Sequence, residues 1–189
     1  MSILLTSPHS LCTGNEIGHM CDSAAHEMIT QLSQKIKEAT IIQSDIHRSQ
    51  CDNNRRKMYP GCETSLFFQK VEHFIDTKKP ILILDIHSYP NNTLSFTDSI
   101  GKIYDFVVLL PSVLYDKKLI KLLAGKLEEK RIYVGFLQGS HINWVMEYST
   151  QKGIHSLLFE FNEDFERNNE IIDCIVECVL EWTTKNREF

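Results

Sequence analysis

Short apolar runs alternate along the chain with longer stretches in which apolar residues recur every three or four positions. The runs predict strands, because they are too short for buried helices and are bounded by polar or turn-forming residues. The longer stretches predict amphipathic helices. The predicted strands cover 2–6, 40–43, 81–86, 105–110, 131–137 and 156–161. The predicted helices cover 15–36, with Asn15 as the N-cap, 66–75, 114–130 and 171–182.

The run 81–86 is apolar until Asp85, which indicates a strand that is buried on both faces. Such strands, alternating with helices, predict a three-layer α/β domain in which helices cover both faces of a largely parallel sheet. No repeat, linker or low-complexity segment divides the chain, so we expect residues 1–189 to form a single domain. In this class of fold, functional groups gather at the carboxyl ends of the strands.

Composition narrows the function classes. The chain has 20 basic and 25 acidic residues and a formal net charge of −5, so it lacks the basic surface of a general nucleic-acid binder. No apolar run reaches the roughly 20 residues that cross a bilayer, and no signal peptide is evident at the N-terminus. We therefore expect a cytoplasmic protein without a membrane partner, in which all six cysteines are free thiols.

Polar residues with metal-binding or acid–base chemistry follow the predicted strands. Asp85 and His87 interrupt an otherwise apolar strand, and side chains two apart on a strand point the same way. We expect His87 to be a metal ligand and Asp85 to lie behind it as a hydrogen-bond partner. His9 follows the first strand, and Glu160 is the single acid of the apolar strand 156–161. A buried pair formed by Asp85 and His87 for structural reasons alone is the alternative interpretation.

Two histidines and one carboxylate are the protein ligands of a hydrolytic zinc site that keeps a position open. Such an ion polarises a carbonyl and lowers the pKa of water. Either Glu16 or Asp22 supplies the carboxylate, since both follow His9 closely. The irregular segment 45–61 contributes Arg48 and Arg55, and guanidinium groups bind carboxylates and stabilise developing negative charge.

Four blocks in this order resemble the N-formylglutamate amidohydrolase-like family, which is related to the zinc carboxypeptidase and aspartoacylase fold. They lie at 8–10, 47–55, 85–90 and 153–162. The second block resembles the family's Ser-Arg-x-x-x-Asp-x-Asn-Arg loop, with His47 in place of the serine, and the third resembles its Asp-x-His-Ser-x-Pro strand end. The resemblance implies a single three-layer domain with a mixed, mainly parallel sheet. It also implies a metal-dependent hydrolase that uses zinc to cleave the amide of a small N-acylated amino acid.

The resemblance also implies the metal ligands. His9 and His87 would bind zinc. Glu16 is our choice as third ligand, because residues 15–16 resemble part of the aspartoacylase His-Gly-Asn-Glu motif and lie nearer His9. Asp22 remains the alternative, since it fits the amidohydrolase spacing.

Catalytic and substrate-binding roles are implied in the same way. Glu160 would activate water and return its proton to the leaving amine, while Arg48 would stabilise the oxyanion. Asn54 and Arg55 would hold a substrate carboxylate. His141 belongs to a segment, 139–142, that resembles a glycine-rich substrate loop.

Two other functions compete with the amidohydrolase. A non-catalytic protein that keeps the same pocket would bind an anionic metabolite or a peptide end. A cysteine hydrolase using Cys51 or Cys62 has no supporting local motif. Retention of the histidines, arginines and Glu160 together favours the zinc enzyme.

Overall fold

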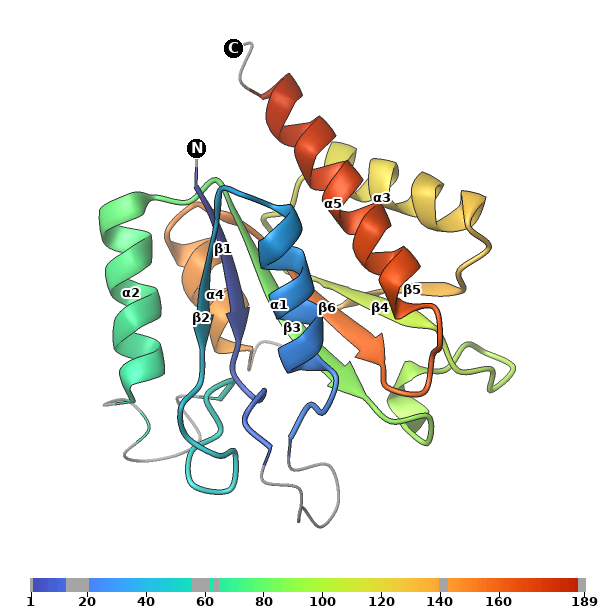
Figure 1. Ribbon diagram of the computed structural model, residues 1–189, viewed down its shortest axis with the longest axis horizontal. Coiled ribbons are helices and arrows are strands. Elements are labelled where there is room, and N and C mark those ends of the chain that lie inside the picture. Colours follow the sequence, from blue (N-terminus) through green and yellow to red (C-terminus); the bar gives the residue numbers. More distant parts are fainter. Residues whose placement is uncertain (1, 13–20, 56–61, 63–64, 140–142, 187–189) are drawn as a thin grey trace.

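A computed structural model of the chain describes residues 2–12, 21–55, 62, 65–139 and 143–186. Its centre is one six-stranded sheet with the order β2-β1-β3-β6-β4-β5 (Figure 1). Strands β1, β2, β3 and β6 are parallel to one another. Strand β4 pairs with β6 in the antiparallel sense, and β5 pairs with β4 in the parallel sense. The strands are β1 (Ile3–Ser7), β2 (Ala39–Gln43), β3 (Leu82–Tyr89), β4 (Phe106–Leu110), β5 (Val134–Gln138) and β6 (His155–Asn162).

Helices cover both faces of this sheet (Figure 1). Alternate residues of a strand face opposite sides, so Leu5 packs in one core cluster and Leu4 in the other. The first cluster includes α1 (Ala25–Lys35), α3 (Lys117–Glu129) and α5 (Asn168–Lys185), and the second includes α2 (Leu66–Lys78) and α4 (Trp144–Gln151). The expected three-layer α/β fold with a mixed, mainly parallel sheet is therefore confirmed.

The local sequence pattern missed two elements and placed the start of a third too early. Helix α4 has only eight residues, which is too short to show a clear apolar periodicity, and no side chain caps its start. Packing secures it instead, since the ring of Trp144 lies 4.6 Å from that of Phe68 on α2. The 3-10 turn Leu94–Phe96 was also not expected. Helix α1 begins at Ala25 rather than after Asn15, and Asn15 itself lies outside the described residues.

The expectation of six free thiols is wrong. Two disulfides join Cys12 to Cys21 and Cys51 to Cys62, each with 5.5 Å between the Cα atoms. Cysteine spacing alone does not reveal which cysteines pair. The remaining pair on α5 is free and buried, as two small core residues on one helical face should be.

None of the helices that the model describes is both long enough and apolar enough to cross a bilayer.

Candidate metal centre and active site

The polar residues expected at strand ends do come together. Strands β1, β3 and β6 are parallel neighbours, so His9, His87 and Glu160 all lie toward the same edge of the sheet. His87 and Glu160 are paired in the β3–β6 register, which places their side chains on the same face. The rings of His9 and His87 meet edge to face with 5.2 Å between their centroids.

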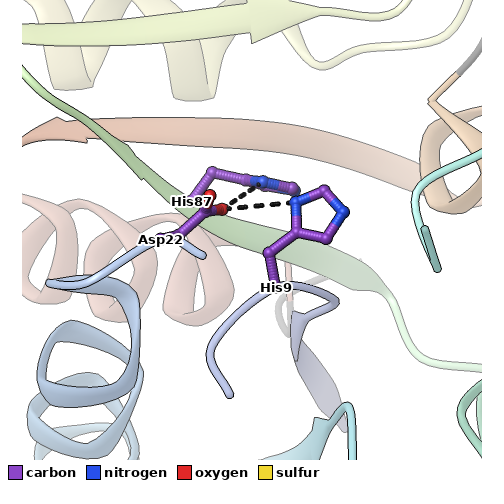
Figure 2. A group of neighbouring side chains, drawn as sticks. All are labelled: His9, Asp22 and His87. Atoms are coloured by element: carbon purple, nitrogen blue, oxygen red, sulfur yellow. Dashed lines mark ion pairs between the residues drawn. The ribbon is translucent and has the colours of Figure 1, made fainter. Parts of the chain in front are cut away.

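Asp22 completes a buried cluster with these histidines (Figure 2). Its Oδ2 lies 2.7 Å from Nδ1 of His87 and 3.5 Å from Nδ1 of His9. One candidate ligand atom from each residue lies within 4.8 Å of the others. Two imidazole nitrogens and a carboxylate oxygen therefore converge on one point, as three protein ligands of a metal do.

Each histidine is held from behind by a second carboxylate. Nε2 of His9 donates to Oδ1 of Asp52 at 2.7 Å, and Nε2 of His87 donates to Oδ2 of Asp85 at 3.2 Å. A carboxylate that accepts a hydrogen bond from Nε2–H keeps the proton of a neutral imidazole on Nε2, so that the lone pair of Nδ1 is available to a metal. The contact between Asp85 and His87 is the one that the strand spacing predicted, and it is common to the metal site and to the structural pair.

Charge also favours a cation at this point. Asp22 and Asp85 are 1% and 0% exposed, and buried carboxylates need compensating positive charge. The pKa of His87 is raised well above its usual value: burial opposes the charged form, but Asp85 and Asp22 outweigh it. The donor set, its burial and its negative charge all fit a divalent metal such as zinc.

Among the described residues, the carboxylate that lies between the two histidines is that of Asp22, the alternative that spacing left open. Glu16, our choice as third ligand, lies outside the described residues. The amide of Asp22 donates to the carbonyl of His9 at 3.0 Å, so the two residues are fastened together directly.

Asp52 organises the arginine loop around the histidines. Its Oδ1 accepts the amide of Asn54 at 3.1 Å in addition to His9, while its Oδ2 lies 3.3 Å from Nε of Arg48 and 3.7 Å from Nε of Arg55. Burial alone would raise the pKa of Asp52, but His9, Arg48 and the Asn54 amide together lower it to about 2. The Asp52 carboxylate is therefore ionised at neutral pH. Because it contacts Arg48 and Arg55 at Nε, the terminal guanidinium nitrogens of both arginines can point toward a ligand.

The same loop is tied to α4. The carbonyl of Asn54 accepts the amide of Trp144 at 2.9 Å, and its side-chain amide donates to Asn143 at 3.4 Å. Asn143 was not singled out from the sequence, because its role depends on a helix that local periodicity did not reveal. His141, the other residue expected near the substrate, lies outside the described residues.

Glu160 is half-buried and makes no side-chain hydrogen bond to any residue in the described part of the chain. Burial raises its pKa to about 8, with His87 opposing the rise and Asp22 and Asp85 adding to it. A carboxyl group with a pKa near neutrality beside a cation site is suited to accept and return a proton.

The sheet order and the helical layers define a three-layer α/β fold, and solved structures that include a metallo-carboxypeptidase share it. N-formylglutamate amidohydrolase from Ralstonia eutropha JMP134 has a similar structure, with a TM-score of 0.69, 14% identity and coverage of 98% of this chain and 94% of that one.

Two further solved structures share the fold. The CwlD amidase from Clostridioides difficile, solved with the GerS lipoprotein, gives a TM-score of 0.62 at 14% identity, covering 97% and 99% of the two chains. A metallo-carboxypeptidase from Burkholderia cenocepacia gives 0.56 at 12% identity, covering 97% of this chain and 57% of that one. No protein-family model matches the chain, and no curated protein matches its sequence.

Proposed function

We propose that the protein is a zinc-dependent amidohydrolase that cleaves the amide bond of a small N-acylated amino acid or a similar carboxylate-bearing substrate. The observation that carries the proposal is the convergence of His9, Asp22 and His87 beside Glu160. Structural neighbours that are named as an amidohydrolase and an amidase support the reaction class.

His9 and His87 would hold the metal through Nδ1, and Asp22 would hold it through Oδ2. The bound zinc would supply Lewis-acid polarisation of the amide carbonyl and a lowered pKa of water. Asp52 and Asp85 keep the two imidazoles in the orientation and tautomer that such binding needs.

Glu160 is the proposed general base and acid. It removes a proton from the attacking water and delivers the same proton to the nitrogen of the leaving amine, so it ends each cycle as it began. Burial raises the pKa of Glu160, which suits the second step, because a strongly acidic carboxyl would release the proton too readily to protonate the amine. The positive charge of bound zinc would lower this pKa and keep Glu160 ionised for the first step.

The arginine loop has two proposed tasks. Arg48 stabilises the negative charge that develops on the carbonyl oxygen. Arg55, more exposed than Arg48, binds the substrate carboxylate together with Asn54, and His141 is proposed to contact the same substrate. Asp52 fixes both arginines at Nε, so the two tasks share one anchor.

The decisive experiment is a screen of N-acylated amino acids with the zinc-loaded protein and its Glu160→Gln variant. We expect the variant to fold, retain zinc and lose nearly all turnover, because glutamine cannot accept the proton. Glu166→Gln is the matched control, since this exposed glutamate follows the same strand. A wild-type protein that binds zinc but hydrolyses no N-acyl amino acid or peptide would instead favour the anion-binding protein.

A further inference from the structure

Helix α1 lacks a capping side chain of its own. Ala24 occupies the N-cap position and makes no side-chain cap hydrogen bond. The first amides of a helix have no partner inside the helix and need acceptors from elsewhere. A serine, threonine or aspartate at the N-cap normally meets this need, which alanine cannot do.

Two residues from other elements instead hold the segment that leads into the helix, by accepting the amides of its last two residues. The amide of Ala24 donates to Oγ of Ser88 at 3.2 Å, and the amide of Ser23 donates to Oε1 of Glu163 at 2.9 Å. Ser88 also donates its hydroxyl proton to the same Oε1 of Glu163 at 2.7 Å. We refer to Ser88 and Glu163 as the clasp.

The clasp is rigidly attached to the sheet. Ser88 is part of β3 and is 1% exposed. Glu163 follows β6 directly, and its amide donates to the carbonyl of Tyr89 at 2.9 Å. A carboxylate at the start of α1 is also favoured by the helix dipole.

Each clasp contact lies next to a residue of the candidate metal centre. Ser23 follows Asp22, and Ser88 follows His87. The carbonyl of Asp22 in turn accepts the amide of Ala25 at 3.1 Å. The clasp therefore joins the segment that carries the carboxylate ligand to the strand that carries a histidine ligand.

We propose that Ser88 and Glu163 are positioning residues that hold Asp22 beside His87; this inference rests on the proposed zinc function. Without the clasp, the amides of Ser23 and Ala24 would turn to water, and the Asp22 segment would sample several positions. Metal binding would then have to order this segment, and its affinity would fall.

The test compares the zinc dissociation constants of four variants, measured by competition with a chromophoric chelator. Ser88→Ala and Glu163→Ala should each weaken zinc binding about tenfold, as loss of an outer partner of a metal ligand does. The double variant should be no weaker than either single one, because both act through one unit. Glu163→Gln keeps an acceptor oxygen and should restore affinity to within about threefold of wild type.

Asp116→Ala is the matched control. Asp116 caps helix α3 by accepting the amides of Lys118 and Leu119, away from the metal centre. Its loss should lower the melting temperature but leave zinc affinity unchanged. Zinc affinity in Glu163→Ala equal to that of the Asp116→Ala control would overturn the proposal.

Amide hydrogen exchange separates this inference from the zinc function. The amides of Ser23 and Ala24 should exchange faster in Glu163→Ala than in Asp116→Ala, whether or not metal is bound. If wild-type protein takes up no zinc, the proposed function fails, while faster exchange still supports the clasp. Unchanged exchange at both amides would overturn the clasp itself.

Discussion

Replacing Asp52 by asparagine tests the proposed centre most directly, because one carboxylate there contacts His9, a proposed metal ligand, and both arginines of the loop. Oδ1 accepts from His9 and from the Asn54 amide, while Oδ2 faces Nε of Arg48 and Arg55. Asparagine has the same shape but only one acceptor oxygen. Whichever way its amide turns, an N–H group meets another N–H donor.

The buried contact between Asp52 and His9 determines how much zinc affinity the substitution should cost. Asp52 is 2% exposed, and His9 is 3% exposed. An amide nitrogen facing His9 would force the proton onto Nδ1, where the metal has to bind. An amide oxygen facing His9 would keep the tautomer but replace a charge-assisted hydrogen bond by one about half as strong. Either outcome should weaken zinc binding by about 10- to 100-fold, equivalent to about 1.4–2.8 kcal/mol.

Zinc affinity of Asp52→Asn, measured by competition with a chromophoric chelator at pH 7.5, checks this expectation. Asp45→Asn is the control, because Asp45 is an exposed carboxylate in the same loop region and carries the same charge change. We also expect kcat to fall in Asp52→Asn, since Arg48 loses its anchor. A folded Asp52→Asn protein with the zinc affinity of the Asp45→Asn control would refute the role of Asp52 behind His9.

Three further outcomes follow from the site. Asp22→Asn should abolish tight zinc binding while Glu16→Gln retains it, as metal analysis after dialysis would show; the reverse pattern would assign Glu16 as the third ligand. Arg55→Ala should mainly raise KM, and Arg48→Ala should mainly lower kcat by roughly 100-fold, so steady-state kinetics showing the opposite split would exchange their roles. Thiol titration of the denatured protein should find two free thiols before reduction and six after it. Six before reduction would contradict both bridges, whereas two in protein isolated without oxidant would argue for an oxidising compartment instead of the expected cytoplasm.

The sequence by itself determined the layers of the fold and, within the candidate metal centre, the pair formed by His87 and Asp85. Strand β3 was predictable because an apolar run in a parallel sheet is buried on both faces whatever surrounds it. The same run identified His87, and the fixed two-residue period of a strand placed Asp85 behind it. Both patterns involve residues that are neighbours in sequence, so they can be recognised without the tertiary structure.

Only the tertiary structure decided which groups meet across the chain. Asp22 lies beside the histidines, and the amides of the two residues after it are accepted by Glu163 and Ser88, 140 and 64 positions away in sequence. The pairing of the cysteines and the packing of helix α4 against α2 likewise depend on the folded arrangement of the chain. Such contacts leave no periodic trace in the sequence, because each satisfies a hydrogen bond or fills a space that exists only once the sheet has formed.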